Sequence, residues 1–183
     1  MELIKNLKET SIIKNLFIAI CGTIILAVSA KVKIPFYPVP MTMQTFVVVL
    51  MGITFGWRLG VATISLYLFE GIIGLPVFAG TPEKGIGLVY FMGPTMGYLI
   101  GFLFATFFAG YLNLKTNLIV IFLKLILSVF FIYLFGIVWL GILIGWEKPI
   151  FKLGFFPFIY AELFKILLLT FLTSRFIKIR KFI

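Results

Sequence analysis

Residues 118–144 read LIVIFLKLILSVFFIYLFGIVWLGILI, a run of 27 residues in which Lys124 is the only charged side chain. A helix needs roughly 20 apolar residues to cross a hydrocarbon core about 30 Å thick, so this run is long enough to span a membrane with some tilt. Its apolar residues do not alternate with polar ones, which favours a helix over a strand of a membrane barrel. The stretch therefore predicts an all-α integral membrane protein.

The composition of the whole chain points the same way. Of the 183 residues, 62% are hydrophobic and 12% are charged, and the mean hydropathy is +1.21. Soluble domains carry about a quarter charged residues, so we expect lipid and not water around most of this chain. The formal net charge of +10 would also suit nucleic acid. The basic residues flank apolar segments, however, which is typical of membrane orientation, and no nucleic-acid partner is expected.

The chain has the length of one membrane domain, residues 1–183, with six transmembrane helices. The predicted spans are about 12–30, 42–56, 61–74, 93–111, 118–144 and 154–176. Three connecting segments stand out, namely the proline-rich residues 35–40, the glycine-rich residues 75–92 and the connector 145–152. Prolines cannot continue a helix, so residues 35–40 are expected to form a stiff, extended connector.

The distribution of lysine and arginine predicts how the chain is oriented. Alternate ends of the spans carry nine basic residues on one side and five on the other. The richer side holds Lys5, Lys8, Lys14, Arg58, Lys115, Arg175, Lys178, Arg180 and Lys181, and the poorer side Lys31, Lys33, Lys84, Lys148 and Lys152. The richer side is expected in the cytoplasm, so both termini face inward across the plasma membrane. The three connecting segments then face outward, where a ligand pocket lined by them would open.

Small residues recur at four-residue spacing in three places. Glycines do so at Gly52, Gly56 and Gly60 and at Gly93, Gly97 and Gly101, and the first span carries Ala19, Thr23 and Ala27. Such stripes let helix backbones approach closely. Packing within this chain is one interpretation of each stripe. Docking of a partner membrane subunit against Ala19, Thr23 and Ala27 is the other.

Four charged residues lie inside the predicted spans: Glu70, Lys124, Glu162 and Lys165. An unpaired charge in hydrocarbon costs roughly 2.5–3.5 kcal/mol on insertion scales, which makes each a candidate for a functional site. Glu162 and Lys165 are three residues apart and share a helix face. They either neutralise one another or grip the two ends of a polar ligand. Glu70 and Lys124 lie near span ends, where a long side chain reaches the interface.

Little in the sequence suggests catalysis. With one cysteine, Cys21, and no histidine, the chain has no intrachain disulfide, no Cys/His zinc site and no histidine acid–base chemistry. It has no Gly-x-x-x-x-Gly-Lys-Ser/Thr loop for ATP hydrolysis. A Ser–Lys nucleophile is the catalytic arrangement that remains, but no serine lies near Lys165 in the sequence. No enzyme activity, metal or cofactor is expected.

Four blocks of sequence resemble the BioY family, the biotin-specific substrate-binding components of energy-coupling-factor transporters. They are Pro38–Thr45 (PVPMTMQT), Leu68–Gly80 (LFEGIIGLPVFAG), Tyr90–Phe102 (YFMGPTMGYLIGF) and Pro157–Lys165 (PFIYAELFK). The blocks occur in order and cover most of the chain. This sequence has Glu162 where the family usually has aspartate, and Thr81–Lys84 interrupts a stretch that is richer in glycine in relatives.

The resemblance implies six helices, an outward-facing site and association with a membrane coupling subunit and two ATPase subunits. It implies that Glu162 and Lys165 belong to the biotin site, with Thr42, Gln44, Gly80 and Tyr90 as further contacts. In this hypothesis Glu162 accepts from the ureido N–H groups and Lys165 pairs with the carboxylate, although the opposite assignment is left open. A turn-capping role is the alternative for Gln44. A component for another vitamin and a membrane enzyme or scaffold are the alternatives for the chain.

Overall fold

The structure is a computed structural model that describes residues 2–80 and 87–180, with side chains from residue 11 onwards. Five helices make up most of it: α1 (Glu2–Lys31), α2 (Gln44–Ile72), α4 (Met96–Tyr111), α5 (Leu118–Ile144) and α7 (Ile159–Ile179). The short elements are β1 (Lys33–Ile34), β2 (Met41–Thr42), α3 (Leu88–Phe91), α6 (Ile150–Gly154) and the 3-10 helix η2 (Phe156–Phe158). The prediction of an all-α fold is confirmed. Four charges used in the orientation argument, on Lys5, Lys8, Lys84 and Lys181, lie outside the described side chains, as does the stretch Thr81–Lys84.

Four segments of the described chain are long and apolar enough to cross a membrane. They are Ser11–Lys31, Gln44–Ile72, Leu118–Ile144 and Ile150–Ile179, and Met96–Tyr111 is a shorter apolar helix. The predicted span 154–176 is broken at its start, because η2 contains Pro157, which has no N–H to donate to a helix. The regular helix α7 therefore begins only at Ile159. Similarly, α4 begins at Met96, after Gly93-Pro94-Thr95.

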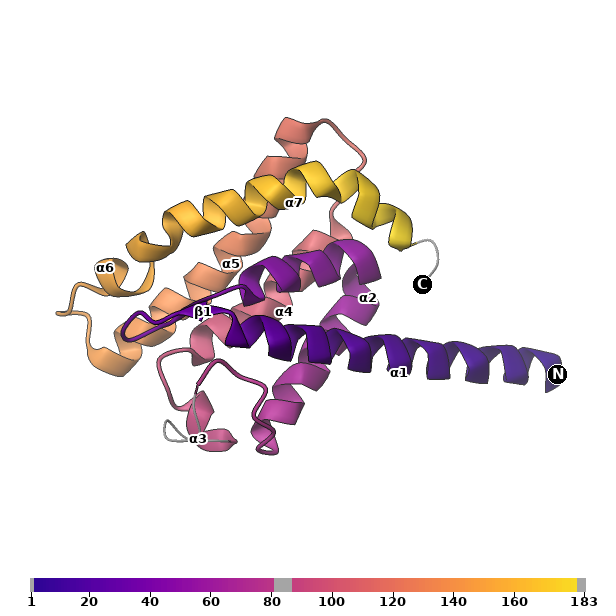
Figure 1. The fold of residues 1–183 in the computed structure, drawn as a ribbon, viewed down its shortest axis with the longest axis horizontal. Helices are drawn as coiled ribbons and strands as arrows, with labels where there is room; N and C mark the ends of the chain where they lie inside the picture. Colours follow the sequence, from indigo (N-terminus) through magenta and orange to yellow (C-terminus); the bar gives the residue numbers. More distant parts are fainter. Residues whose placement is uncertain (1, 81–86, 181–183) are drawn as a thin grey trace.

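Helix α2 is a hairpin of two helical arms. At Gly56 the backbone takes φ 75° and ψ 174°, which is not helical and which favours glycine. The sequence predicts two spans joined by a short loop, and the structure makes the turn at this single residue (Figure 1). The Gln44 side-chain amide donates to the Tyr67 hydroxyl at 2.7 Å, which ties the start of the first arm to the second. At 1.5 Å per residue, the first arm is about 18 Å long and the second about 24 Å.

The glycine stripes pack helices of this chain against each other. A methyl group at Gly52 would lie 2.6 Å from the Thr106 carbonyl oxygen of α4, and one at Gly101 would lie 2.9 Å from the Phe131 carbonyl oxygen of α5. Helix α4 therefore lies against α2 on one side and α5 on the other. The helices are so close that no side chain fits at Gly52 or Gly101. For both stripes the structure shows packing within the chain.

The small-residue stripe on α1 faces the interior of this chain as well. Ala19 is 6% exposed and Thr23 is 2% exposed, and Ala27 is half-buried. The Thr23 hydroxyl donates to the Glu70 carboxylate of α2 at 2.9 Å. The stripe is thus covered by α2, as the interpretation of packing within this chain expects, and docking of a partner subunit against Ala19, Thr23 and Ala27 stays a prediction. The exposed face of α1 is formed instead by large apolar residues such as Phe17, Ile24 and Val28.

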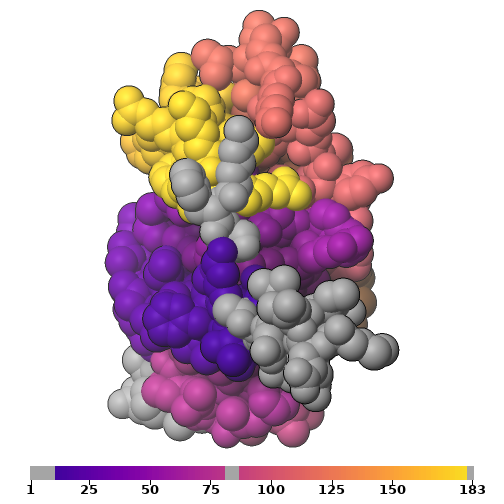
Figure 2. Space-filling model, turned by 90° about the vertical axis from the view of Figure 1, so that its right-hand side faces the viewer, coloured from indigo at the N-terminus to yellow at the C-terminus, as the bar shows by residue number. Residues whose placement is uncertain are grey.

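The two ends of the molecule differ in character. Both described termini, the Gly56 turn and the α4–α5 connection lie toward one end, and the segments 32–43, 73–80, 87–95 and 145–158 gather at the other (Figure 1). At the terminal end, α7 lies beside α2 (Figure 2), and the Arg180 guanidinium donates to the Gly110 carbonyl at 3.1 Å. The three connecting segments that the sequence analysis placed on one side therefore have their described residues at one end of the molecule. This is expected when successive spans run in opposite directions.

We expect Gly52→Ala to destabilise the protein by about 1–3 kcal/mol, because the added methyl group meets backbone atoms of α4 that cannot move independently. Thermal unfolding of the detergent-solubilised protein measures the change. Ala62→Leu is the control, since it adds more bulk at an exposed position of the same helix. Equal melting temperatures for Gly52→Ala and the unchanged protein would contradict close packing of α2 on α4.

Candidate ligand-binding site

A small chamber, which we call the inner chamber, lies inside the bundle near the loop end. Its volume is about 50 Å³. Residues from the β2–α2 segment, the 73–95 segment, α4, α5, η2 and α7 line it: Val39, Pro40, Met41, Thr42, Gln44, Thr45, Ala79, Tyr90, Thr95, Tyr98, Leu99, Phe102, Ile132, Tyr133, Phe158 and Glu162. The chamber therefore joins all four blocks of sequence that were singled out above.

Glu162 is the one carboxylate among the described residues that line the inner chamber. It is 6% exposed, and its Oε1 atom accepts from the Lys165 ammonium at 2.8 Å and from the Thr45 hydroxyl at 2.8 Å. Both donors bind the same carboxylate oxygen, so they hold the side chain of Glu162 in one orientation. A carboxylate fixed at the chamber wall can accept hydrogen bonds from ligand N–H groups.

Lys165 does not line the chamber. Its ammonium donates to Glu162 at 2.8 Å, to the Thr45 hydroxyl at 3.0 Å and to the Thr42 carbonyl at 2.6 Å. An ammonium has three N–H groups, and all three are used within the protein. The structure thus contains the internal ion pair that the sequence analysis offered as an alternative. Lys165 also holds the β2–α2 junction against α7.

Thr42 and Gln44 form the rim of the chamber beside this pair. The Thr42 hydroxyl contacts the Gln44 backbone N–H at 3.3 Å and the Gln44 side-chain oxygen at 3.4 Å. Gln44 is 4% exposed, and its amide nitrogen is bound to Tyr67. The residue preceding Gln44, Met43, takes the N-cap position of α2 without a side-chain cap. Gln44 thus faces the chamber and is not a capping residue.

Aromatic side chains make up much of the remaining wall. Tyr98 and Tyr133 meet edge to face at 5.9 Å between ring centroids, and Phe158 lies 6.2 Å from Tyr133. The Tyr98 hydroxyl donates to the Gly154 carbonyl at 2.8 Å, so this ring is fixed to the connector before α7. An apolar wall with a few convergent polar groups is the usual form of a small-molecule site.

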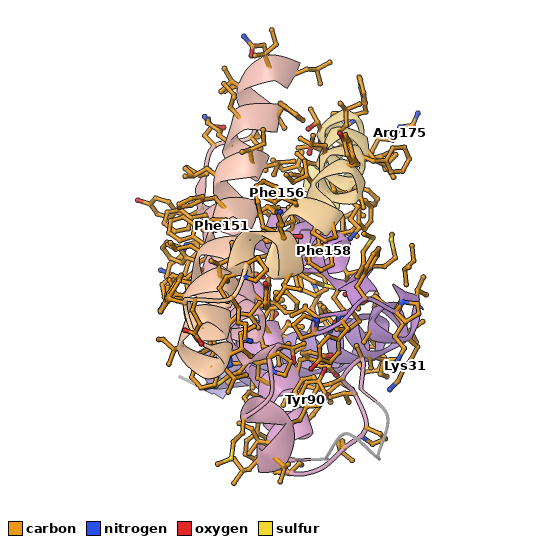
Figure 3. The ribbon with its side chains drawn as sticks, turned by 90° about the vertical axis from the view of Figure 1, so that its left-hand side faces the viewer. Lys31, Tyr90, Phe151, Phe156, Phe158 and Arg175 are labelled. Carbon is orange, nitrogen blue, oxygen red and sulfur yellow. The ribbon has the colours of Figure 1, made fainter. Side chains whose placement is uncertain are left out.

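A second cavity, the outer chamber, adjoins the first and has a volume of about 140 Å³. It is lined by Lys33, Pro35, Phe36, Pro38, Pro40, Ala79, Gly80, Tyr90, Gly93, Pro94 and Thr95. Gly80 lies here and not in the inner chamber, and a methyl group on it would lie 2.5 Å from the Tyr90 ring. Figure 3 looks onto this end, with Tyr90 on the lower side and Phe158 above it.

Tyr90 lies between the two chambers and lines both. Its ring stacks on Phe78 at 4.7 Å between centroids. Burial raises the pKa of the Tyr90 phenol above its usual value, although hydrogen bonding with Thr95 and the Gly80 backbone acts in the opposite direction. The phenol is therefore a neutral group at neutral pH.

The other two charged residues of the spans lie away from both chambers. Glu70 accepts from Thr23, and Lys124 donates to the Asn113 carbonyl near the end of α4. Neither is among the lining residues of either chamber. Within the described residues no group of three His, Cys, Asp or Glu side chains is arranged to hold a metal ion.

Several lining residues were not predicted as site residues. Thr45 bonds both members of the ion pair, and its place in the Pro38–Thr45 block was the available signal. Tyr98, Phe102 and Phe158 also lie within the quoted blocks and Tyr133 lies outside them, but aromatic residues are frequent throughout this chain at 18%, so their type did not mark them as site residues. Sequence alone does not say which of them point inward.

Comparisons with known proteins agree with one another. The model of the BioY family matches residues 4–182. A protein of Pyrococcus horikoshii named "Probable biotin transporter BioY" is 37% identical over 158 residues, which cover 86% of this chain and 89% of that one. The "Biotin transporter BioY" of Thermotoga maritima is 32% identical over 158 residues, covering 86% and 92%.

A solved structure is similar over nearly the whole chain. It is the S-component for biotin from an ECF-type ABC transporter, with a TM-score of 0.76, 25% sequence identity, and coverage of 92% of this chain and 93% of that one. The long apolar helices and these relatives identify a multi-pass membrane protein. With the family model matched from residue 4 to residue 182, the chain belongs to the BioY family.

Proposed function

We propose that the chain captures biotin and delivers it for ATP-driven uptake, as the substrate-binding (S) component of an energy-coupling-factor transporter. The observation that carries the proposal is Glu162, a carboxylate only 6% exposed that borders a chamber with aromatic walls. An ionisable group at such a position inside a membrane protein costs free energy unless it has a function or a partner. The relatives and the similar structure are named for biotin, which suggests biotin as the ligand.

Biotin matches the inner chamber in its chemistry. Its ureido ring offers two N–H donors and a carbonyl, and its thioether ring is apolar. Glu162 accepts from the N–H groups, the Gln44 side chain lies on the same wall, and Tyr98, Phe102 and Tyr133 surround the ring system. Lys165 acts on Glu162, because the ion pair holds the carboxylate in its orientation. In this proposal Lys165 is a positioning residue and does not itself contact the carboxylate of biotin.

The ligand needs more room than the inner chamber provides. Sites for small molecules usually have about 300–1,000 Å³, and the inner and outer chambers have about 50 and 140 Å³. Biotin therefore occupies both chambers, and the side chains between them shift when it binds. Thr42, Tyr90 and Gly80 contribute along this path, Gly80 by leaving space for the Tyr90 ring.

Transport would depend on partner subunits. The sequence contains no phosphate-binding loop, so a membrane coupling subunit and two ATPase subunits would supply the energy. The large apolar residues on the exposed face of α1 offer one surface for contact with lipid or with such a subunit. A component for another vitamin, or a membrane enzyme or scaffold, is the alternative, and neither is favoured by a particular feature of the chambers.

The plasma membrane is the proposed location, with both termini in the cytoplasm and the chambers open to the outside. The excess of Lys and Arg at the terminal end supports this orientation. Biotin would then enter past the segments 32–43 and 73–95.

Glu162→Gln should weaken biotin binding about 30- to 4,000-fold, because loss of one partner of a buried charged hydrogen bond costs roughly 2–5 kcal/mol. Isothermal titration of the purified protein measures the dissociation constant. Glu70→Gln is the matched control, since it removes another intramembrane carboxylate that lines neither chamber. If Glu162→Gln keeps its melting temperature and binds biotin as tightly as the unchanged protein, Glu162 does not belong to the site.

A reporter that is active only in the cytoplasm should work when fused after Ile183. The basic residues near the C-terminus, among them Arg175 and Lys178, set this orientation. A reporter inserted in the 145–149 connector should be silent, because that connector lies at the opposite end of the molecule. Activity of the second fusion and silence of the first would reverse the proposed topology.

Purification of the tagged chain from its native membrane should recover ATPase subunits together with it. Vesicles that contain the purified complex should take up biotin. An enzyme or scaffold that acts alone has no need of such subunits. Mass spectrometry of the purified complex identifies both proteins and bound small molecules. Recovery of a different vitamin in the site would favour the second transport hypothesis.

A further inference from the structure

Lys33 is the single cationic side chain among the described residues that line the two chambers. It lies in the wall of the outer chamber, in strand β1. Its ammonium donates to the Ala79 carbonyl. Since an ammonium has three N–H groups, two remain for a further acceptor. Lys165, in contrast, has all of its N–H groups bound within the protein.

The β1–β2 ribbon connects Lys33 to the inner chamber. Lys33 pairs with Thr42 in the antiparallel register, so a residue of the outer chamber lies directly opposite a residue of the inner chamber. Thr42 lines the inner chamber and Lys33 the outer one. Four residues, Pro40, Ala79, Tyr90 and Thr95, are common to the two linings. A ligand whose ring lies beside Glu162 therefore extends past these residues to Lys33.

The charges of the two chambers are complementary to a ligand with two different ends. Among its described lining residues the inner chamber has the Glu162 acceptor, which suits ligand N–H groups, and no Lys or Arg that could pair with a carboxylate. The outer chamber has a cation and walls of proline and aromatic residues, which suit an alkyl chain that ends in a carboxylate. We infer that Lys33 binds the carboxylate at the end of the biotin tail, while the ring system lies in the inner chamber. This assignment rests on the proposed function and gives Lys33 the role that the sequence analysis gave to Lys165.

A comparison of two ligands tests the assignment. Biotin and its uncharged primary amide share the ring system and differ in the charge of the tail. Lys33→Met should weaken the binding of biotin about tenfold and of the amide less than twofold, because one solvent-accessible charged hydrogen bond is lost. The effect on biotin should fall at high salt, since Lys33 is exposed. Lys33→Arg should restore most of the affinity for biotin.

Lys31→Met is the matched control. Lys31 donates to the Phe78 carbonyl at 2.8 Å, so it ties down the same loop as Lys33, but it lines neither chamber. It lies at the edge of the loop end in Figure 3. Lys31→Met should therefore leave the ratio of the two dissociation constants unchanged. Lys165→Met should weaken both ligands together, because it disturbs Glu162.

The outcomes separate the assignment from the proposed function. If the unchanged protein fails to bind biotin, the proposed function is wrong. If it binds biotin but Lys33→Met weakens acid and amide equally, Lys33 only holds the loop and the inference is overturned. A selective loss of the acid in Lys165→Met, with none in Lys33→Met, would overturn it as well and return the carboxylate to Lys165.

Discussion

The ion pair between Glu162 and Lys165 is the interaction on which the loop end of the molecule depends. Two charges inside a membrane bundle must find partners, because hydrocarbon offers none. Lys165 finds three, and two of them are Thr42 and Thr45 at the β2–α2 junction. The same contact that neutralises the pair therefore fixes the start of α2 against α7. Three residues that this contact brings together, Thr42, Thr45 and Glu162, form one part of the wall of the inner chamber.

Aromatic side chains of the helices donate to backbone carbonyls around the chambers. Tyr67 donates to the Val77 carbonyl at 2.9 Å, Tyr98 to the Gly154 carbonyl and Trp139 to the Gly93 carbonyl at 2.9 Å. Val77 and Gly93 belong to non-helical segments and Gly154 is the last residue of the short helix α6, where carbonyls lack helical partners. Backbone outside helices is tolerated at membrane depth only when protein groups satisfy it. These aromatic residues thus make it possible for loops, and not helices alone, to line a site.

The sequence predicted the class of fold because that class follows from long apolar runs, which do not depend on tertiary contacts. It singled out Glu162 as a candidate for a similar reason, since a carboxylate in an apolar span stands out without a structure, and the structure places this residue at the wall of the inner chamber. It did not predict that Lys165 would miss the chamber. Residues three apart on a helix differ by about 60° in direction, so one can face a cavity while the other faces a neighbouring helix. Nor did it show that α2 would cover the Ala19 stripe, because a stripe of small residues shows close packing and not the identity of the neighbour.

The turn at Gly56 determines how deep inside the bundle the first residues of α2 lie. The first arm of α2 is about 18 Å long, against about 40 Å for α5, so its starting residues lie inside the bundle and not at its end. If the chambers open outward as proposed, a molecule beside Gln44 and Glu162 is separated from the opposite side by one short arm and its turn. Binding would then already carry the ligand through part of the membrane, and the energised step would have less distance left to provide.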